Sequence, residues 1–157
     1  MYVNLHPIEL LDESLADPAG LGAHASRIVL EVTERASLSE IEGSQARVKA
    51  LRAAGFRVAV DDLGAGYSGL SSRTDLEPDT VKLDMTLVRD VWQSPVKKSV
   101  VRAMTELCSE LGVTLVAEGV ETQQERIALE ALGVKLMQGY LFGRPTRQFP
   151  AARREAV

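Results

Sequence analysis

The sequence predicts an α/β fold built on a parallel sheet of about six strands. Short runs rich in Val, Leu and Ile alternate with longer stretches of helical periodicity, which is the pattern of repeated βα units. Crossovers between parallel strands are right-handed, which leaves a doubly wound sheet or a (β/α) barrel. No glycine-rich phosphate loop follows the first predicted strand, which disfavours a dinucleotide-binding domain.

The first half of the chain supplies three predicted strands and two predicted helices. Pro7 opens the first helix, which extends to Leu15, because proline is tolerated in a first helical turn. Ser37 is a helix N-cap candidate with Glu40 three residues later, the spacing of a capping box, and this second helix ends at Gly55. The three strands are expected over residues 2–5, 27–32 and 56–60.

The second half supplies three more strands and two more helices. A helix from Pro95 to Leu111 is followed by a glycine, which stops it, and Thr122 caps a last helix that ends at Gly133. The strands are expected over residues 80–83, 113–117 and 134–137. The buried face of the long helix is expected to comprise Val96, Val100, Met104, Leu107 and Leu111. We expect one domain over residues 1–148 and a polar tail over 149–157.

Composition narrows the class of protein. The 157 residues are 45% apolar and carry a formal net charge of -4, with no basic stripe, so binding to polymeric nucleic acid is disfavoured. Cys108 is the single cysteine, which excludes an internal disulfide and predicts a buried, reduced thiol. No apolar run approaches the ~20 residues of a membrane span, and no signal peptide opens the chain. We therefore expect a cytoplasmic location.

A polar or charged residue stands at the end of every predicted strand. In a parallel barrel these positions converge on one face, where active sites lie. Carboxylates often end strands simply as helix caps, but that explanation accounts for one or two such positions rather than six. The residues are Asn4, Glu31, Asp61 with Asp62, Lys82 with Asp84, Glu118 and Gln138.

This set of side chains supplies oxygen ligands, which select hard cations such as Mg²⁺ or Mn²⁺. His6 and His24 have no spaced partner, which disfavours zinc. Adjacent aspartates, here Asp61 and Asp62, can bridge two metals about 4 Å apart, an arrangement used for phosphodiester hydrolysis. Lys82 is expected to orient the water or stabilise the leaving oxygen, the alternative being a plain surface lysine.

Six segments resemble the EAL domain family. Residues 61–68 (DDLGAGYS) are similar to the family's DDFGTGYSS loop, 117–121 to its AEGVE segment and 138–145 to its QGYLFGRP run. Residues 3–5 (VNL), 30–34 (LEVTE) and 81–84 (VKLD) resemble three further signatures, in the family's order. The resemblance implies a TIM-like (β/α) barrel, here incomplete with about six βα units, and Mg²⁺- or Mn²⁺-dependent hydrolysis of cyclic di-GMP to linear pGpG.

The resemblance also implies roles for individual residues. Asn4, Glu31 and Asp61 would bind one metal, Asp61 would be shared with a second metal, and Lys82 would contact the catalytic water. Asp62 and Glu118 would complete the second metal site. Residues that would support the substrate or the loop after Asp62 are Glu34, Gly64, Gly66, Tyr67, Ser68, Asp84, Glu121, Gln138 and Pro145. Expected partners are cyclic di-GMP, a second copy in a homodimer or swapped oligomer, and an upstream sensor or cyclase domain.

Two kinds of departure from the family pattern affect these expectations. Leu63, Ala65 and Gly69 replace the family's Phe, Thr and Ser. The strand bearing Glu-Ala-Leu, whose glutamate is a metal ligand in the family, is not in the sequence. We therefore expect an open or strained barrel that self-associates, with feeble or no hydrolysis.

Two alternative functions are also considered. A non-catalytic EAL-like module that binds nucleotide or protein is one alternative, although every family carboxylate within the covered region is retained. An unrelated two-metal hydrolase on a barrel is the other, and the order of the motifs disfavours it.

Overall fold

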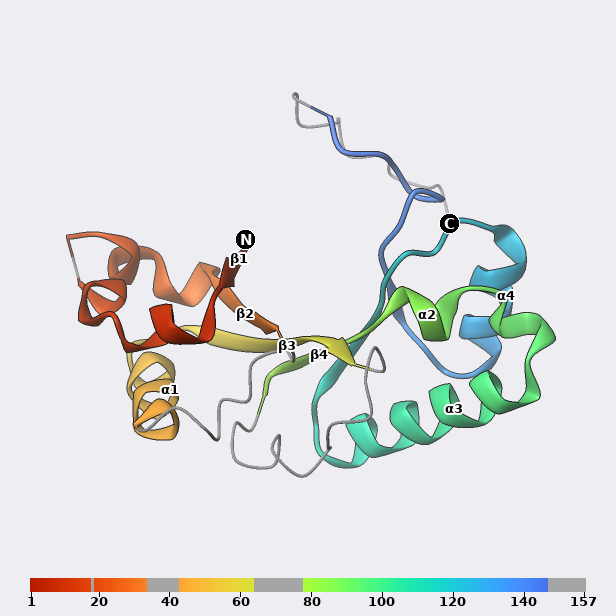
Figure 1. The fold of residues 1–157 in the computed structure, drawn as a ribbon, viewed down its shortest axis with the longest axis horizontal. Coiled ribbons are helices and arrows are strands. Elements are labelled where there is room, and N and C mark those ends of the chain that lie inside the picture. The colour runs from red at the N-terminus through yellow and green to blue at the C-terminus, as the bar shows by residue number, and fades with distance from the viewer. Residues whose placement is uncertain (18, 34–42, 64–77, 147–157) are drawn as a thin grey trace.

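The structure is a computed structural model that describes residues 1–17, 19–33, 43–63 and 78–146 (Figure 1). Six strands form one sheet in the order β1-β2-β3-β4-β5-β6, and each strand runs parallel to its neighbours. The strands are β1 (Tyr2–Leu5), β2 (Val29–Thr33), β3 (Arg57–Leu63), β4 (Thr80–Leu83), β5 (Thr114–Ala117) and β6 (Leu136–Met137). The predicted six-stranded parallel sheet is therefore confirmed. Within the described residues β1 does not pair with β6, so the sheet is an open arc rather than a closed barrel.

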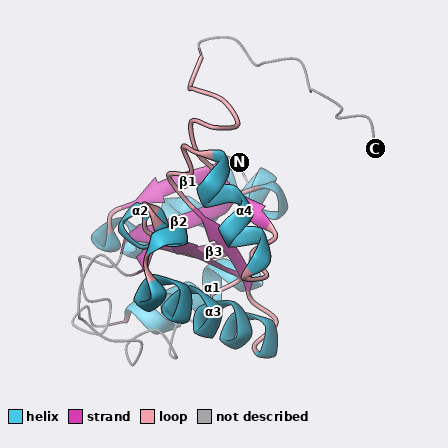
Figure 2. Ribbon diagram, turned by 90° about the vertical axis from the view of Figure 1, so that its right-hand side faces the viewer, coloured by secondary structure: helices cyan, strands magenta, loops and turns pink. Residues whose placement is uncertain are grey.

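Four α-helices are described: α1 (Ser44–Ala53), α2 (Met85–Val88), α3 (Pro95–Glu110) and α4 (Gln123–Ala131). Both views place α1 and α3 on the same side of the sheet (Figures 1 and 2). None of the helices in the described ranges is long and apolar enough to cross a bilayer.

The buried apolar side chains form two separate groups. The first core cluster joins β1, β2 and β3 to α1 and the turns after β1, with Leu30, Leu51 and Val58 fully buried. The second core cluster joins β4 and β5 to α3 and α4, with Leu83 and Leu129 fully buried. The β3–β4 ladder joins the strands of the first core cluster to those of the second.

The predicted helix over 7–15 is wrong. Two 3₁₀ helices, η1 (Pro7–Leu11) and η2 (Glu13–Ala16), occupy this stretch. They are separated at Asp12, whose backbone is extended and whose Oδ1 accepts the backbone N–H of Ser14 at 2.9 Å. A side chain that bonds the backbone two residues ahead competes with a continuous α-helix. A third 3₁₀ helix, η3 (Leu21–Arg27), follows, and β2 begins two residues later than expected.

The helices of the second half begin and end close to their predicted positions. Ser94 Oγ accepts from the N–H of Lys97 and begins α3, and Thr122 begins α4. The predicted buried face of α3 is partly wrong, because Val96, Val100 and Leu111 are exposed. Its buried residues are Val101, Met104 and Cys108, so the stripe facing the sheet is rotated from the predicted one. The predicted buried thiol is confirmed. The predicted cap at Ser37 and Glu40 lies outside the described residues.

Candidate active site

The strand register brings polar residues to one face of the sheet. Asn4 lies directly opposite Glu31, and Asp61 lies opposite the residue two positions beyond Glu31. Lys82 is opposite the residue two positions before Glu118. Side chains two residues apart on a strand point to the same face. All five residues therefore belong to one face, near the carboxyl ends of their strands.

Three carboxylates converge on the ammonium group of Lys82. Its Nζ lies 2.6 Å from Glu31 Oε1, 2.6 Å from Glu118 Oε1 and 3.3 Å from Asp61 Oδ1. The Lys82 side chain is only 8% exposed, and the three carboxylates are between 7% and 20% exposed. Nζ also lies 5.9 Å from the centre of the Tyr2 ring. The structure thus assembles charges from β2, β3, β4 and the end of β5 around one buried cation.

Mutual interactions set the protonation of this cluster. Burial alone would lower the pKa of Lys82, but hydrogen bonds to Glu118 and Glu31 outweigh it and hold that pKa above its usual value. Burial raises the pKa of Glu118, the hydrogen bond from Lys82 opposes this rise, and the charge of Asp61 adds to it. Lys82 is therefore charged, and burial is the main cause of the raised pKa of Glu118.

An irregularity in the β3–β4 ladder lies at Asp61 and Asp62. Val60 pairs with Val81, but Leu63 pairs with Leu83, so β3 advances three residues where β4 advances two. Two residues of the longer strand then oppose one residue of its partner, as in a β-bulge. Here the residue opposed is Lys82. The side chain of Asp62 lies outside what the structure describes.

Glu118 leads into a tightly packed loop. Its backbone N–H donates to the carbonyl of Leu83 at 3.1 Å, which continues the ladder one residue beyond β5. Gly119 follows with φ +68°, and a Cβ there would lie 2.7 Å from the Cβ of Met85. On the other side, a Cβ at Gly139 would collide with the carbonyl oxygen of Val120. The loop is therefore held between α2 and the segment after β6.

A second polar network fixes the far end of this loop, and the sequence analysis named Glu121 in it but missed Arg89 and Glu125. Arg89 Nη1 lies 2.8 Å from Glu121 Oε2 and 3.9 Å from Glu125 Oε1. The Glu125 carboxylate is buried and accepts the backbone N–H groups of Glu121 and Thr122 at 2.9 Å each, and that of Asp90 at 3.2 Å. The spacing of Thr122 and Glu125 is that of a capping box, which is the signal that would have identified Glu125.

A pocket of about 490 Å³ opens beside Glu118. The loops after β4, β5 and β6 line it, with Arg89, Glu121 and Tyr140 among the side chains. Arg144 lies over the Tyr140 ring at 4.8 Å from its centre. The pocket is therefore continuous with the charged cluster and carries polar groups of both signs.

The remaining predicted residues fall into three groups. Asp84 lines this pocket and caps α2, its Oδ1 accepting from the N–H of Thr86 at 2.8 Å. Gln138 also lines it, and its backbone bonds join Ala117 to Val120. Pro145 is exposed. Five predicted residues lie outside the described part of the chain: Glu34, Gly64, Gly66, Tyr67 and Ser68.

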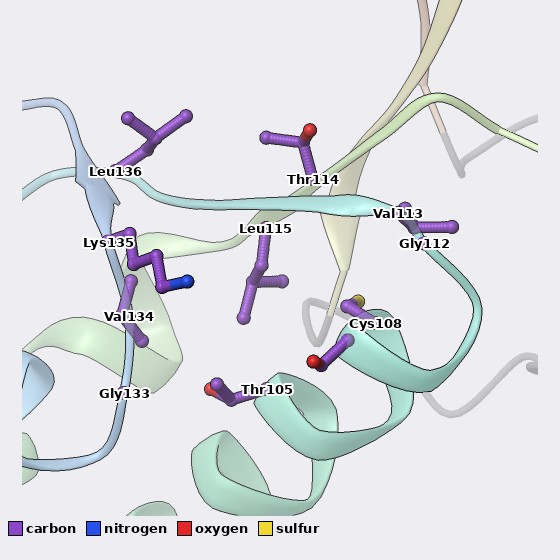
Figure 3. A pocket seen from close by; sticks show the side chains of 11 residues that line it. Thr105, Cys108, Gly112, Val113, Thr114, Leu115, Gly133, Val134, Lys135 and Leu136 are labelled. Atoms are coloured by element: carbon purple, nitrogen blue, oxygen red, sulfur yellow. The ribbon is translucent and has the colours of Figure 1, made fainter.

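Another cavity, of about 500 Å³, lies at the opposite ends of β5 and β6 (Figure 3). The last turns of α3 and the residues that enter the two strands line it, with Thr105, Cys108 and Lys135 directed toward it. None of the charged residues of the Lys82 cluster lines this cavity. The chemistry of the site is thus confined to the carboxyl ends of the strands.

The family model for the EAL domain matches residues 1–145. The chain belongs to the EAL domain family. The recognition made from the six motifs is confirmed, as is the TIM-like α/β fold class, since the structural relatives are EAL proteins.

Curated relatives match this chain over part of their own length. The probable cyclic di-GMP phosphodiesterase PdeA of Escherichia coli is 36% identical over 91% of this chain and 20% of its own length. The cyclic di-GMP phosphodiesterase RocR of Pseudomonas aeruginosa is 35% identical over 90% of this chain and 38% of its own length. This EAL chain therefore spans a fifth to two fifths of these two relatives.

Solved structures give the same fold. BlrP1 of Klebsiella pneumoniae, in a manganese/cyclic di-GMP complex, has a TM-score of 0.80 at 39% identity, covering 92% of this chain and 38% of that chain. The EAL domain of Mycobacterium smegmatis DcpA has a TM-score of 0.81 at 33% identity, covering 92% of this chain and 67% of that chain.

The chemical type of the ligand atoms in this EAL chain suits a hard divalent cation. Asn4, Glu31, Asp61 and Glu118 offer oxygen ligands, and three of them already converge on a positive charge. The oxygens of Glu31, Asp61 and Glu118 lie at hydrogen-bonding or ion-pairing distances from the ammonium nitrogen of Lys82. Among the described residues, no group of three or more His, Cys, Asp or Glu side chains has a geometry ready to hold a metal ion. The described carboxylates therefore supply suitable ligand oxygens but are arranged around the ammonium group of Lys82.

Proposed function

We propose that this chain carries the core of a metal-dependent phosphodiesterase that hydrolyses cyclic di-GMP to linear pGpG. The observation that carries the proposal is the convergence of Glu31, Asp61 and Glu118 on Lys82 at the carboxyl ends of parallel strands. An EAL relative in complex with manganese and cyclic di-GMP supports the same choice of cation and ligand. Mg²⁺ and Mn²⁺ are the cofactors that such an oxygen-rich donor set selects.

The oxygen ligands of the site would bind the cations, and Lys82 would contact the reacting oxygens. Asn4, Glu31 and Asp61 would hold one cation, and Asp61 would share a second with Asp62 and Glu118. Divalent cations bound there activate water and neutralise the phosphate charge.

Lys82 would donate a hydrogen bond to the attacking water or to the departing ester oxygen. The water oxygen forms a bond to phosphorus as the ester bond breaks, and the departing oxygen takes up a proton. The pocket beside Glu118 offers room for part of the nucleotide.

The proposal includes expectations about the activity, assembly and domain organisation of the chain. The isolated 157 residues are expected to hydrolyse weakly, because the glutamate of the Glu-Ala-Leu strand is not among them. A homodimer or swapped oligomer, an upstream sensor or cyclase domain and a cytoplasmic location are further parts of the proposal. The assignment of 1–148 as the partial domain, with 149–157 as a polar tail, is retained with them.

The first experiment is hydrolysis by the purified chain. The protein is incubated with cyclic di-GMP and Mn²⁺, and pGpG is followed by chromatography. Glu118→Ala removes a ligand of the cluster, so any activity should fall by at least about 100-fold. Glu106→Ala, an exposed glutamate on α3, is the matched control and should retain the activity. Measurable and equal rates for wild type and Glu118→Ala would refute the assigned site.

A non-catalytic module is the second candidate. The antirepressor BluF of Escherichia coli, a protein named for regulation rather than hydrolysis, is 32% identical over 90% of this chain. Under this reading the chain binds cyclic di-GMP without turnover. Calorimetry that detects nucleotide binding, together with unchanged nucleotide after prolonged incubation with Mn²⁺, would favour this candidate.

A further inference from the structure

The Lys82 ammonium stands at the point toward which the carboxylates of the cluster aim. Two of its contacts are 2.6 Å long and the third is 3.3 Å, and they reach Nζ from residues on three other strands or strand ends. All four side chains are at most 20% exposed, so water screens their charges poorly. Lys82 is therefore the counterion of the assembled site.

Among the side chains that the structure describes, the cluster holds more negative than positive charge. Its three carboxylates and one ammonium sum to about -2 when all are ionised, in a largely buried space. A divalent cation carries the opposite charge. A cation bonded to these oxygens and an ammonium hydrogen-bonded to them cannot occupy the same point, however, and like charges at such separations repel strongly.

We propose that Lys82 acts as a resident counterion that occupies the metal position in the metal-free chain and must release its carboxylate contacts when a divalent cation binds. The inference rests on the proposed function for the identity of the metal ligands. It assigns Lys82 a role in metal affinity that is separate from any contact with water or substrate. In the metal-free chain Lys82 keeps Glu31, Asp61 and Glu118 together, and during binding it competes with the metal.

The test compares Mn²⁺ affinity in the absence of substrate. Free Mn²⁺ is measured by electron paramagnetic resonance during titration of the wild type and of Lys82→Met, an uncharged side chain of similar length. Loss of the competing charge should tighten Mn²⁺ binding by at least about tenfold. Thermal unfolding should show a less stable metal-free protein that gains more from Mn²⁺ than the wild type does. Lys135→Met, which removes an exposed lysine from the opposite ends of the strands, should change neither quantity.

Unchanged or weaker Mn²⁺ binding by Lys82→Met would overturn the inference, as would the absence of measurable binding by both proteins. If Lys82→Met does not fold, the wild type decides the question through NMR of its lysine ammonium groups, with the Lys82 signal identified by its loss in Lys82→Arg. Saturating Mg²⁺ should then shift that signal and speed its exchange with water, and an unaltered signal would overturn the inference.

These outcomes are distinct from those of the hydrolysis assay. Tighter Mn²⁺ binding by Lys82→Met, together with measurable pGpG formation that Glu118→Ala leaves unchanged, would remove the proposed function and leave the counterion role. Hydrolysis by the wild type with unchanged Mn²⁺ affinity in Lys82→Met would support the proposed function and overturn the counterion role.

Discussion

Glu125 is buried beneath the loop that carries Glu118 and Glu121, and its carboxylate accepts three backbone hydrogen bonds. Glu125→Ala would leave those partly buried N–H groups without their acceptor, which costs about 1–3 kcal/mol. We expect a loss of this size in the free energy of unfolding, measured by urea denaturation. Glu130→Ala, at an exposed position of α4's last turn, is the control and should cost less than about 0.5 kcal/mol.

The same residue makes a prediction about pH. Burial alone would raise the pKa of Glu125, but the backbone N–H groups of Glu121, Thr122 and Asp90 outweigh it and hold that pKa below its usual value. A lowered pKa in the folded state stabilises the protein above the unfolded pKa of about 4.3 and loses that contribution as pH falls through the folded value. The stability difference between wild type and Glu125→Gln should therefore shrink as pH drops below about 4.3. A constant difference down to pH ~3 would contradict the assigned ionisation.

Much of the charged cluster could be predicted from the sequence, because its residues occupy strand ends and parallel strands bring such ends together. Glu31, Asp61, Lys82 and Glu118 were predicted on that ground, and the structure brings them together. Arg89 was missed because it follows a short helix that no periodicity marks. That Lys82 lies at the centre of the carboxylates also could not be predicted, since strand order gives proximity but not which side chain occupies the middle.

Gly119 connects β5 to the packed loop, and two separate constraints act on it. Its φ of +68° disfavours other residues, and a Cβ would also collide with Met85. Gly112 has the same φ of +68° with nothing within 4 Å of an added Cβ. Gly119→Ala should therefore destabilise the protein by about 1–3 kcal/mol more than Gly112→Ala does, as measured by thermal or urea unfolding. Equal costs would show that α2 yields to the new methyl group.

The buried face of helix α3 could not be predicted from the spacing of its apolar residues. Spacings of three and four residues fit both the predicted stripe, which includes Val96 and Leu111, and the observed one of Val101, Met104 and Cys108. The sequence alone could not decide which stripe faces the sheet, because both contain apolar residues at helical spacing. Similarly, the bulge at Asp61 and Asp62 depends on the pairing with β4, which no local signal encodes.

The open sheet leaves apolar side chains uncovered at both of its edges. Tyr2 on β1 and Leu136 on β6 are each 50% exposed, and edge strands also present unpaired backbone groups. We expect the chain to self-associate, which size-exclusion chromatography with light scattering would detect as a mass above 17.0 kDa. Leu136→Lys should shift the protein toward the monomer, whereas Val96→Lys, at a 72% exposed position on α3, should not. A stable wild-type monomer across micromolar concentrations would contradict this expectation.

The division of the core into two clusters has a consequence for how the molecule opens. Glu31 and Asp61 stand on strands of the first core cluster, whereas Lys82 stands on a strand of the second and Glu118 directly follows another strand of the second. Each cluster can act as its own cooperative unit, and native-state hydrogen exchange would then show two levels of amide protection.

The ion pairs of Lys82 cross the boundary between those units, as any divalent cation shared by the same carboxylates would. A bound cation should therefore raise the weaker level of protection toward the stronger one, so that the two units unfold as one.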